Sequence, residues 1–138
     1  MRAELKWLDM QHTTQRTATP SARHQALIGS RNFTDCDFMR ENIQALLDRL
    51  PGMERVVSGG AKGADALSER IALDFGLDHW HIPAVWSTYG RAAGPLRHQK
   101  VILEADVVAA FPLGESKGTQ DGIRKARAAG KQGFVFLG

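Results

Sequence analysis

The sequence predicts a single three-layer α/β domain, and three observations support this prediction. The chain has 138 residues, the length of one domain, and 43% of them are hydrophobic, enough for one layered core. From Gln25 onward, short apolar runs alternate with longer segments of helical periodicity. This alternation is typical of βαβ units, in which helices cover a parallel sheet.

Five apolar runs are expected as strands. They are residues 26–28, 55–58, 79–82, 105–111 and 134–137. The run at 105–111 is apolar almost throughout, which favours a central strand covered on both faces. The predicted fold is therefore Rossmann-like, with five parallel strands in the order 3-2-1-4-5 and helices on both faces.

Capping residues and glycines set the expected helix ends. Thr34 is the candidate N-cap of the first helix, which stops before Pro51 and Gly52. A loop that carries Trp86 and Tyr89 precedes the third helix. The remaining helices are expected at residues 64–75, over about ten residues that reach Glu104, and at residues 119–129.

Residues 1–23 differ from the domain at 24–138. Residues 11–21 have no apolar periodicity and are expected to form a flexible arm. Leu5, Trp7, Leu8 and Met10 precede it and are apolar enough to dock. They either cover an edge or face of the domain or pack on a second copy of the chain. The second interpretation predicts a homo-oligomer.

The charge pattern supports binding of anions. The net charge is +3 and the sequence pI is about 9.4, but the positive groups are spread over the chain. No apolar stretch approaches the roughly 20 residues of a membrane helix, and no signal peptide is evident. The single Cys36 cannot form an internal disulfide. A soluble cytoplasmic protein with no membrane association is therefore expected.

Three glycine-containing loops follow the first, second and fourth predicted strands, so they are expected at the carboxyl edge of the sheet, where such folds bind ligands. Glycines allow close backbone approach, free N–H groups at a helix start attract anions, and an arginine can clamp a phosphate. The candidate ligand-binding residues in these loops are Gly29, Ser30, Arg31, Ser58, Gly59, Gly60, Ala61, Lys62, Gly63, Asp65, Gly114, Gly118 and Thr119. This pattern predicts a phosphorylated or nucleotide-like ligand.

Standard cofactor fingerprints do not fit these loops. Lys62 precedes Gly63 and Ala64 follows it, so the Gly-Lys-Ser/Thr ending of a P-loop is missing. The first loop is not a dinucleotide-binding Gly-x-Gly-x-x-Gly sequence, and His79 and His81 alternate along a strand without zinc-ligand spacing. No metal or cofactor is therefore identified, and a nucleotide or ADP-ribose-like molecule is expected as ligand.

Four motifs in order carry a family resemblance. They are Gly29-Ser30-Arg31 with Thr34-Asp35, Val57 through Asp65, Trp86 with Tyr89 through Arg97, and Ala105-Asp106 through Phe111-Pro112 with Gly118-Thr119. From about residue 26 onward the chain resembles the YspA/YpsA-related branch of the SLOG superfamily. The resemblance implies a Rossmann-like nucleotide-binding fold and kinship with the Lonely Guy phosphoribohydrolases and the DprA DNA-processing proteins.

The chain departs from the Lonely Guy motif at its catalytic position. That motif, Pro-Gly-Gly-x-Gly-Thr-x-x-Glu, ends on a catalytic Glu, but here Gly122 stands in its place. The nearest carboxylate, Asp121, is one position early and about 100° away around a helix. His98 stands where the branch often has Asn.

Several side chains have two interpretations each. Arg97 either clamps a ligand or pairs with Glu104 or Asp106, and Arg31 either binds phosphate or pairs with Asp35. Trp86 and Tyr89 either stack on a base or pack against the protein. The candidate catalytic residues are Asp65, Asp121 and His98.

The resulting hypothesis is a protein that binds a nucleotide-derived ligand, either as a sensor or as a hydrolase of N-glycosidic or phosphoester bonds. One alternative is a DprA-like module that binds nucleic acid. The other is an oligomeric interaction protein with a vestigial pocket.

Overall fold

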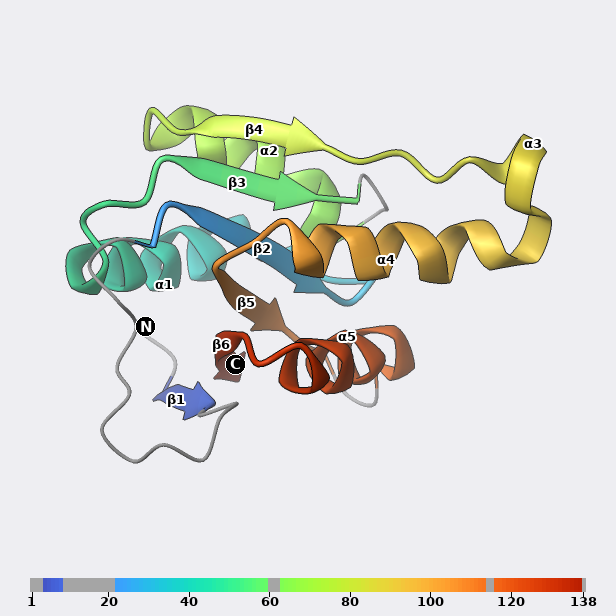
Figure 1. The fold of residues 1–138 in the computed structure, drawn as a ribbon. Helices are drawn as coiled ribbons and strands as arrows, with labels where there is room; N and C mark the ends of the chain where they lie inside the picture. The colour runs from blue at the N-terminus through green and yellow to red at the C-terminus, as the bar shows by residue number, and fades with distance from the viewer. Residues whose placement is uncertain (1–3, 9–21, 60–62, 114–115, 138) are drawn as a thin grey trace.

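The computed structural model describes residues 4–8, 22–59, 63–113 and 116–137 (Figure 1). The elements in chain order are β1 (Glu4–Leu8), β2 (His24–Gly29), α1 (Cys36–Arg49), β3 (Arg55–Ser58), α2 (Ala64–Asp74), β4 (Asp78–His81), α3 (Trp86–Tyr89), the 3-10 helix η1 (Gly90–Ala92), α4 (Ala93–Leu103), β5 (Val107–Phe111), α5 (Lys117–Ala128) and β6 (Gln132–Leu137). Within these described ranges, no helix has both the length and the apolar character that crossing a bilayer requires.

The six strands form one sheet in the order β1-β6-β5-β2-β3-β4. Strands β2 to β6 are all parallel to one another, which gives the predicted order 3-2-1-4-5 and confirms the Rossmann-like fold class. The chain moves outward from β2 through β3 to β4 and then returns to β5 on the other side of β2. The order therefore reverses between β2 and β5, the place where such sheets hold ligands.

Strand β1 is an addition to the predicted sheet. It runs antiparallel to β6, from Glu4 opposite Leu137 to Leu8 opposite Gly133, and so forms an edge of the sheet. These residues belong to the segment that was expected to be an arm at 1–23. Their alternation is too short to separate a strand from an apolar docking segment by periodicity alone.

Two helical layers enclose the sheet, with α1 and α2 on one face and α4 and α5 on the other (Figure 1). Strand β5 shows why both faces are apolar: Val107, Ala109 and Phe111 pack toward α1 and α2, and Val108 and Ala110 pack toward α4 and α5. A strand covered on both sides needs such a continuous apolar run.

Helix ends differ from the prediction where a capping side chain was misassigned. Asp35, not Thr34, caps α1, because its Oδ1 accepts the Phe38 N–H at 3.0 Å. The Thr34 carbonyl instead accepts the Cys36 N–H at 2.9 Å, which delays the helix by one residue. The expected loop around Trp86 is the short helix α3, which is followed by η1.

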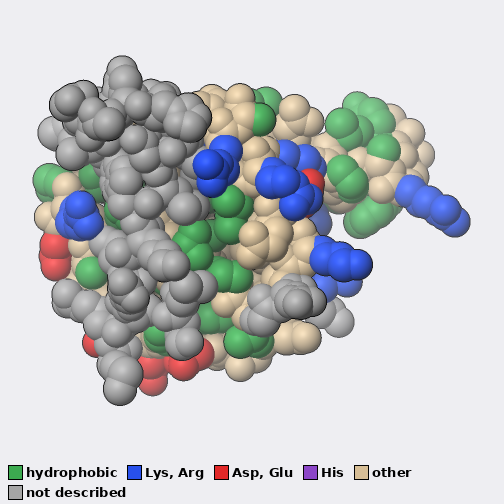
Figure 2. Space-filling model, turned by 90° about the horizontal axis from the view of Figure 1, so that it is seen from below, with side chains coloured by type: hydrophobic (Ala, Val, Ile, Leu, Met, Phe, Trp, Pro, Cys, Tyr) green, Lys and Arg blue, Asp and Glu red, His purple; other side chains and the backbone are tan. Residues whose placement is uncertain are grey.

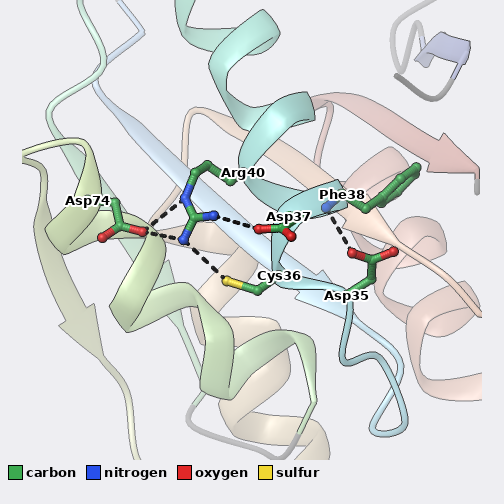
Figure 3. Close-up of polar contacts among 6 residues, drawn as sticks. All are labelled: Asp35, Cys36, Asp37, Phe38, Arg40 and Asp74. Atoms are coloured by element: carbon green, nitrogen blue, oxygen red, sulfur yellow. Dashed lines mark hydrogen bonds and ion pairs between the residues drawn. The ribbon is translucent and has the colours of Figure 1, made fainter. Parts of the chain in front are cut away.

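An arginine on α1 ties that helix to α2 (Figure 3). Arg40 donates from Nε and Nη2 to the Asp74 carboxylate at 3.0 and 2.7 Å, and from Nη1 to Asp37 at 2.9 Å. Its Nη2 also lies 3.6 Å from Cys36 Sγ. Both bonds to Asp74 end on the same oxygen, Oδ2, and these charge-assisted hydrogen bonds join the two helices of one layer.

Candidate functional site

Three neighbouring strands, β3, β2 and β5, end at the same edge of the sheet, and each is followed by one of the predicted glycine loops. The topology therefore brings the three loops together, with the loop after β2 in the middle. Four predicted ligand residues, Gly60, Ala61, Lys62 and Gly114, lie outside the described residues. The remainder of each loop can be placed in detail.

Ser30 joins the first loop to the third. Its Oγ accepts the Leu113 N–H at 2.7 Å and donates to the Leu113 carbonyl at 3.4 Å, and its own N–H donates to the Phe111 carbonyl at 3.2 Å. The residue is 6% exposed. Ser30 therefore holds the loops at the switch point in register.

Gly63 joins the second loop to the first. Its φ is +76°, and a Cβ at this position would overlap the carbonyl oxygens of Ser30 and Arg31. Both facts require glycine, because an L side chain rarely adopts this conformation and backbone atoms cannot move aside cheaply. Gly63 is the N-cap of α2, so this close contact also sets where that helix begins.

Arg97 connects α4 to the second loop. Its Nη1 donates to the Gly59 carbonyl at 2.7 Å, and the side chain is half-buried. The expected alternative partner Asp106 instead accepts the N–H groups of Arg23 and His24 at 2.9 and 3.0 Å. A guanidinium has five N–H donors, so one bond to Gly59 leaves others for an anion.

Arg31 follows Ser30 directly and is exposed. Among the described residues it makes no ion pair, and Asp35, its expected alternative partner, uses its carboxylate to cap α1. The Arg31 backbone lies against Gly63, and Arg97 Nη1 lies against the Gly59 carbonyl. The two arginines therefore approach opposite ends of the second loop. Both can contribute positive charge at this edge.

A buried hydroxyl–imidazole cluster fixes the end of β3. Ser58 Oγ lies 2.8 Å from His79 Nε2, and Ser68 Oγ lies 3.2 Å from the same nitrogen. Burial lowers the pKa of His79, so its imidazole is neutral at pH 7. Ser58 is fully buried, and as the last residue of β3 it anchors the start of the second loop. The register pairs Ser58 with His81 and Val56 with His79, so the contact between Ser58 and His79 runs diagonally between β3 and β4, and the sequence alone did not indicate it.

The start of α5 forms the third side of the site. Ser116 caps the helix by accepting the Thr119 N–H at 3.4 Å, and the two hydroxyls are 2.7 Å apart. Thr119 is buried, whereas the space around the Cα of Gly118 is open, with no atom within 4 Å of a Cβ built there. Gly118 is thus the position in this turn that a ligand can approach closely.

Asp121 is paired on its own helix. Its carboxylate lies 2.9 Å from Lys125 Nζ and 3.4 Å from Arg124 Nη2. The hydrogen bond from Lys125 lowers the pKa of Asp121, which keeps the group ionised. Asp65 lies in the first turn of α2, and its side chain is outside the described part of the structure.

His98 fills the space above Gly122. A Cβ on Gly122 would overlap His98 Nε2 and would lie 2.8 Å from Ile28 Cδ1. Burial lowers the pKa of His98, and the positive charge of Lys125 lowers it further. The buried Nε2 has no hydrogen-bond partner among the residues that the structure describes. The imidazole therefore occupies the space beside the position at which the family resemblance would place a carboxylate.

A cavity of about 310 Å³ lies beside Arg97, between the end of β4 and helix α4. Its lining residues are Ile82, Pro83, Val85, Tyr89, Ala93, Leu96, Arg97 and Lys100. Sequence reasoning singled out Tyr89 and Arg97 but missed Leu96 and Lys100. The signal was present, because positions 93, 96, 97 and 100 share one helix face at spacings of three and four. Trp86 is 58% exposed and is not a lining residue.

The fold and the site define a Rossmann-like α/β domain with three glycine loops at the carboxyl edge of its sheet. The Gene 61 protein of Mycobacterium phage D29 is 35% identical to this chain over 114 residues, which span 78% of this chain and 91% of the phage protein. The chain belongs to the family of that phage protein. No protein-family model matches the sequence, and no solved structure does.

Proposed function

We propose that the protein binds a nucleotide or nucleotide-derived phosphorylated ligand at the carboxyl edge of the sheet. The observation that carries this proposal is the convergence of three glycine loops at one edge of the sheet, with the Arg97 guanidinium fixed on the Gly59 carbonyl of the second loop at 2.7 Å. A fixed guanidinium has lost much of its side-chain freedom before a ligand arrives, so less entropy is lost on binding. The motifs shared with the YspA/YpsA-related branch of the SLOG superfamily support the same ligand class.

The electrostatics of the edge also support an anion. Arg31 and Lys117 are exposed beside the loops, and Lys117 is the first residue of α5. A cation at a helix start opposes the helix dipole unless an anion is present. Phosphate binding would satisfy these cations and the free N–H groups of the first turn together.

The candidate catalytic groups favour binding over bond cleavage. Asp121 is ionised and paired with Lys125, so it has no proton to donate. The Nε2 of His98 faces the backbone at Gly122 rather than an open cavity. We therefore propose a sensor or binding protein, with hydrolysis as the second possibility for the same site.

Ligand-induced stabilisation tests this proposal. A panel of AMP, GMP, ADP-ribose and cyclic nucleotides is screened by thermal shift, and hits are titrated by calorimetry. Ligand at a hundredfold excess over Kd stabilises the folded state by about 2.7 kcal/mol, a shift of several degrees. The shift is expected in the wild type and in Arg127→Ala, an exposed arginine on α5, and is expected to vanish in Arg97→Ala. No shift with any ligand contradicts the proposal.

A segregation of charge between the two helical layers favours one further candidate, nucleic-acid binding. Helices α1 and α2 carry six carboxylates and three arginines, a net charge of −3, whereas α4 and α5 carry six Lys or Arg and one Asp, a net charge of +5. Figure 2 shows Lys and Arg gathered toward the upper right and most Asp and Glu along the lower left rim. Such a face fits a phosphate backbone.

Salt and length dependence separate the two candidates. Binding to single-stranded oligonucleotides by the α4 and α5 layer would weaken steeply with salt and strengthen with length. Saturable binding of a mononucleotide with a modest salt dependence would favour the small-ligand site. Replacing the exposed Arg127 is expected to weaken oligonucleotide binding and to leave mononucleotide binding unchanged.

A further inference from the structure

The cavity between β4 and α4 adds a second half to the edge site. Six of its eight lining residues are apolar or aromatic, and the other two, Arg97 and Lys100, are cations. No lining residue carries a carboxylate. A surface of this composition is complementary to an apolar group that has a negative charge attached to it.

Arg97 is common to the cavity and to the glycine loops. It lines the cavity and also donates to the Gly59 carbonyl at 2.7 Å. A ligand whose phosphate sits against the loops at Arg97 therefore has its other half beside the cavity. This arrangement separates an anion subsite from an apolar subsite with one side chain between them.

The apolar subsite has the character of a site for a flat ring. Tyr89 is 53% exposed and Leu96 is 45% exposed, so both offer uncovered apolar surface at the cavity mouth. Helix α3, which ends at Tyr89, lies beyond the end of the sheet, at the N-terminal end of α4 (Figure 1). An aromatic ring there can stack on any base, because every base has a π-face.

The size of the cavity suits a small ligand group. Its volume of about 310 Å³ lies at the lower end of the range of about 300–1,000 Å³ for small-ligand sites. A space of this size can hold a base with its sugar, with the phosphate outside it at Arg97.

We propose that the cavity formed by Tyr89, Leu96 and Lys100 holds the base of a nucleoside monophosphate whose phosphate is bound at Arg97 and the glycine loops. This proposal rests on the proposed function and assigns its ligand to a single-base phosphomonoester. It also assigns base recognition to the α3–α4 segment, outside the three loops.

Calorimetric titrations with four probes test the inference: AMP, ribose 5-phosphate, adenosine and ADP-ribose. The variants are Leu96→Ser and Tyr89→Ala, with Leu103→Ser as matched control, because Leu103 is a 54% exposed leucine on the same helix that does not line the cavity. We expect AMP to bind more tightly than ribose 5-phosphate, adenosine and ADP-ribose. Both cavity variants should weaken AMP about tenfold, the size of one lost stacking contact, and leave ribose 5-phosphate unchanged.

Each of the other possible results would overturn a stated part of the inference or of the proposed function. If AMP binds and neither cavity variant weakens it, the base lies elsewhere and the inference fails while the proposed function stands. If ADP-ribose, which has the same single base but a diphosphate and a second ribose, binds more tightly than AMP, the phosphomonoester assignment is wrong. If no phosphorylated probe binds, the proposed function fails as well. If Leu96→Ser lowers the mass measured by sedimentation while Leu103→Ser does not, the cavity is an interface between copies and not a ligand site.

Discussion

Adding one methyl group at Gly122 tests how closely α4 and α5 pack at the site. Alanine is favoured over glycine in a helix interior by about 1 kcal/mol. Here, however, the new Cβ would overlap His98 Nε2 and lie 2.8 Å from Ile28 Cδ1. Overpacking of this kind costs about 1–3 kcal/mol, so we expect Gly122→Ala to be neutral or to destabilise the protein by up to about 2 kcal/mol.

The magnitude can be isolated with a double-mutant cycle. In a His98→Ala background the obstructing ring is absent and only the Ile28 Cδ1 contact remains, so Gly122→Ala should then gain up to about 1 kcal/mol. The coupling between the two positions is therefore expected to be about 1–3 kcal/mol, measured by urea unfolding followed by circular dichroism. Gly118→Ala is the control, because a Cβ there meets no atom within 4 Å and has no reason to couple to His98. The reasoning is refuted if Gly122→Ala stabilises both backgrounds equally.

Three other substitutions or conditions test the packing and electrostatics. Gly63→Ala should destabilise by at least about 1–2 kcal/mol in urea unfolding, because its φ is +76° and the Cβ overlaps backbone; a neutral result would contradict the loop contact. Burial lowers the folded-state pKa of His79 and His98. Below about pH 6.5 the unfolded chain therefore binds more protons than the folded protein, and the free energy of unfolding decreases as the pH is lowered. The melting temperature should therefore be lower at pH 5 than at pH 7.5, and an unchanged value would speak against buried neutral imidazoles. Asp74→Asn should lower the melting temperature by removing the charge paired with Arg40 at 2.7 Å. The loss should be smaller in 1 M salt, where the Debye length is about 3 Å, than in 0.1 M salt, where it is about 10 Å; equal losses at both salt concentrations would exclude an ionic contribution.

The fold could be predicted because its determinants are local patterns. The continuous apolar run of β5, with Gly29 at the end of β2 and Gly59 after β3, indicates parallel strands. Leu67, Ile71 and Phe75 recur every four residues, which indicates the helix α2. Strand β1 could not be predicted, because a segment of five residues, three of them apolar, matches a strand and a docking segment equally well. Its assignment depends on pairing with β6, more than 120 residues away along the chain.

The candidate site was predictable in its location and less so in its parts. The carboxyl edge follows from chain order, and so does the meeting of the three loops. The engagement of Ser30 with Leu113 and of Ser58 with His79 depends on how loops and strands meet in space. The sequence predicted these two hydroxyls as ligand contacts. In the structure they make hydrogen bonds within the protein, which hold the loops and strands together.

The position of His98 shows the same division. In the sequence, His98 and Gly122 stood out as two separate expectations. The structure joins them, because the imidazole occupies the space that glycine leaves. A contact between two helices that are far apart in the chain cannot be recognised from one sequence without the helix packing.

The central claim, an anion site at the carboxyl edge of the sheet, is tested most directly by a two-dimensional ¹H–¹⁵N NMR titration with AMP. We predict saturable shifts of the backbone amides of Gly29, Gly59 and Gly118, together with the side-chain Nε–H of Arg97, and none of them with Arg97→Ala. Shifts confined to the outer face of α5, or no shifts at millimolar AMP, would contradict the claim.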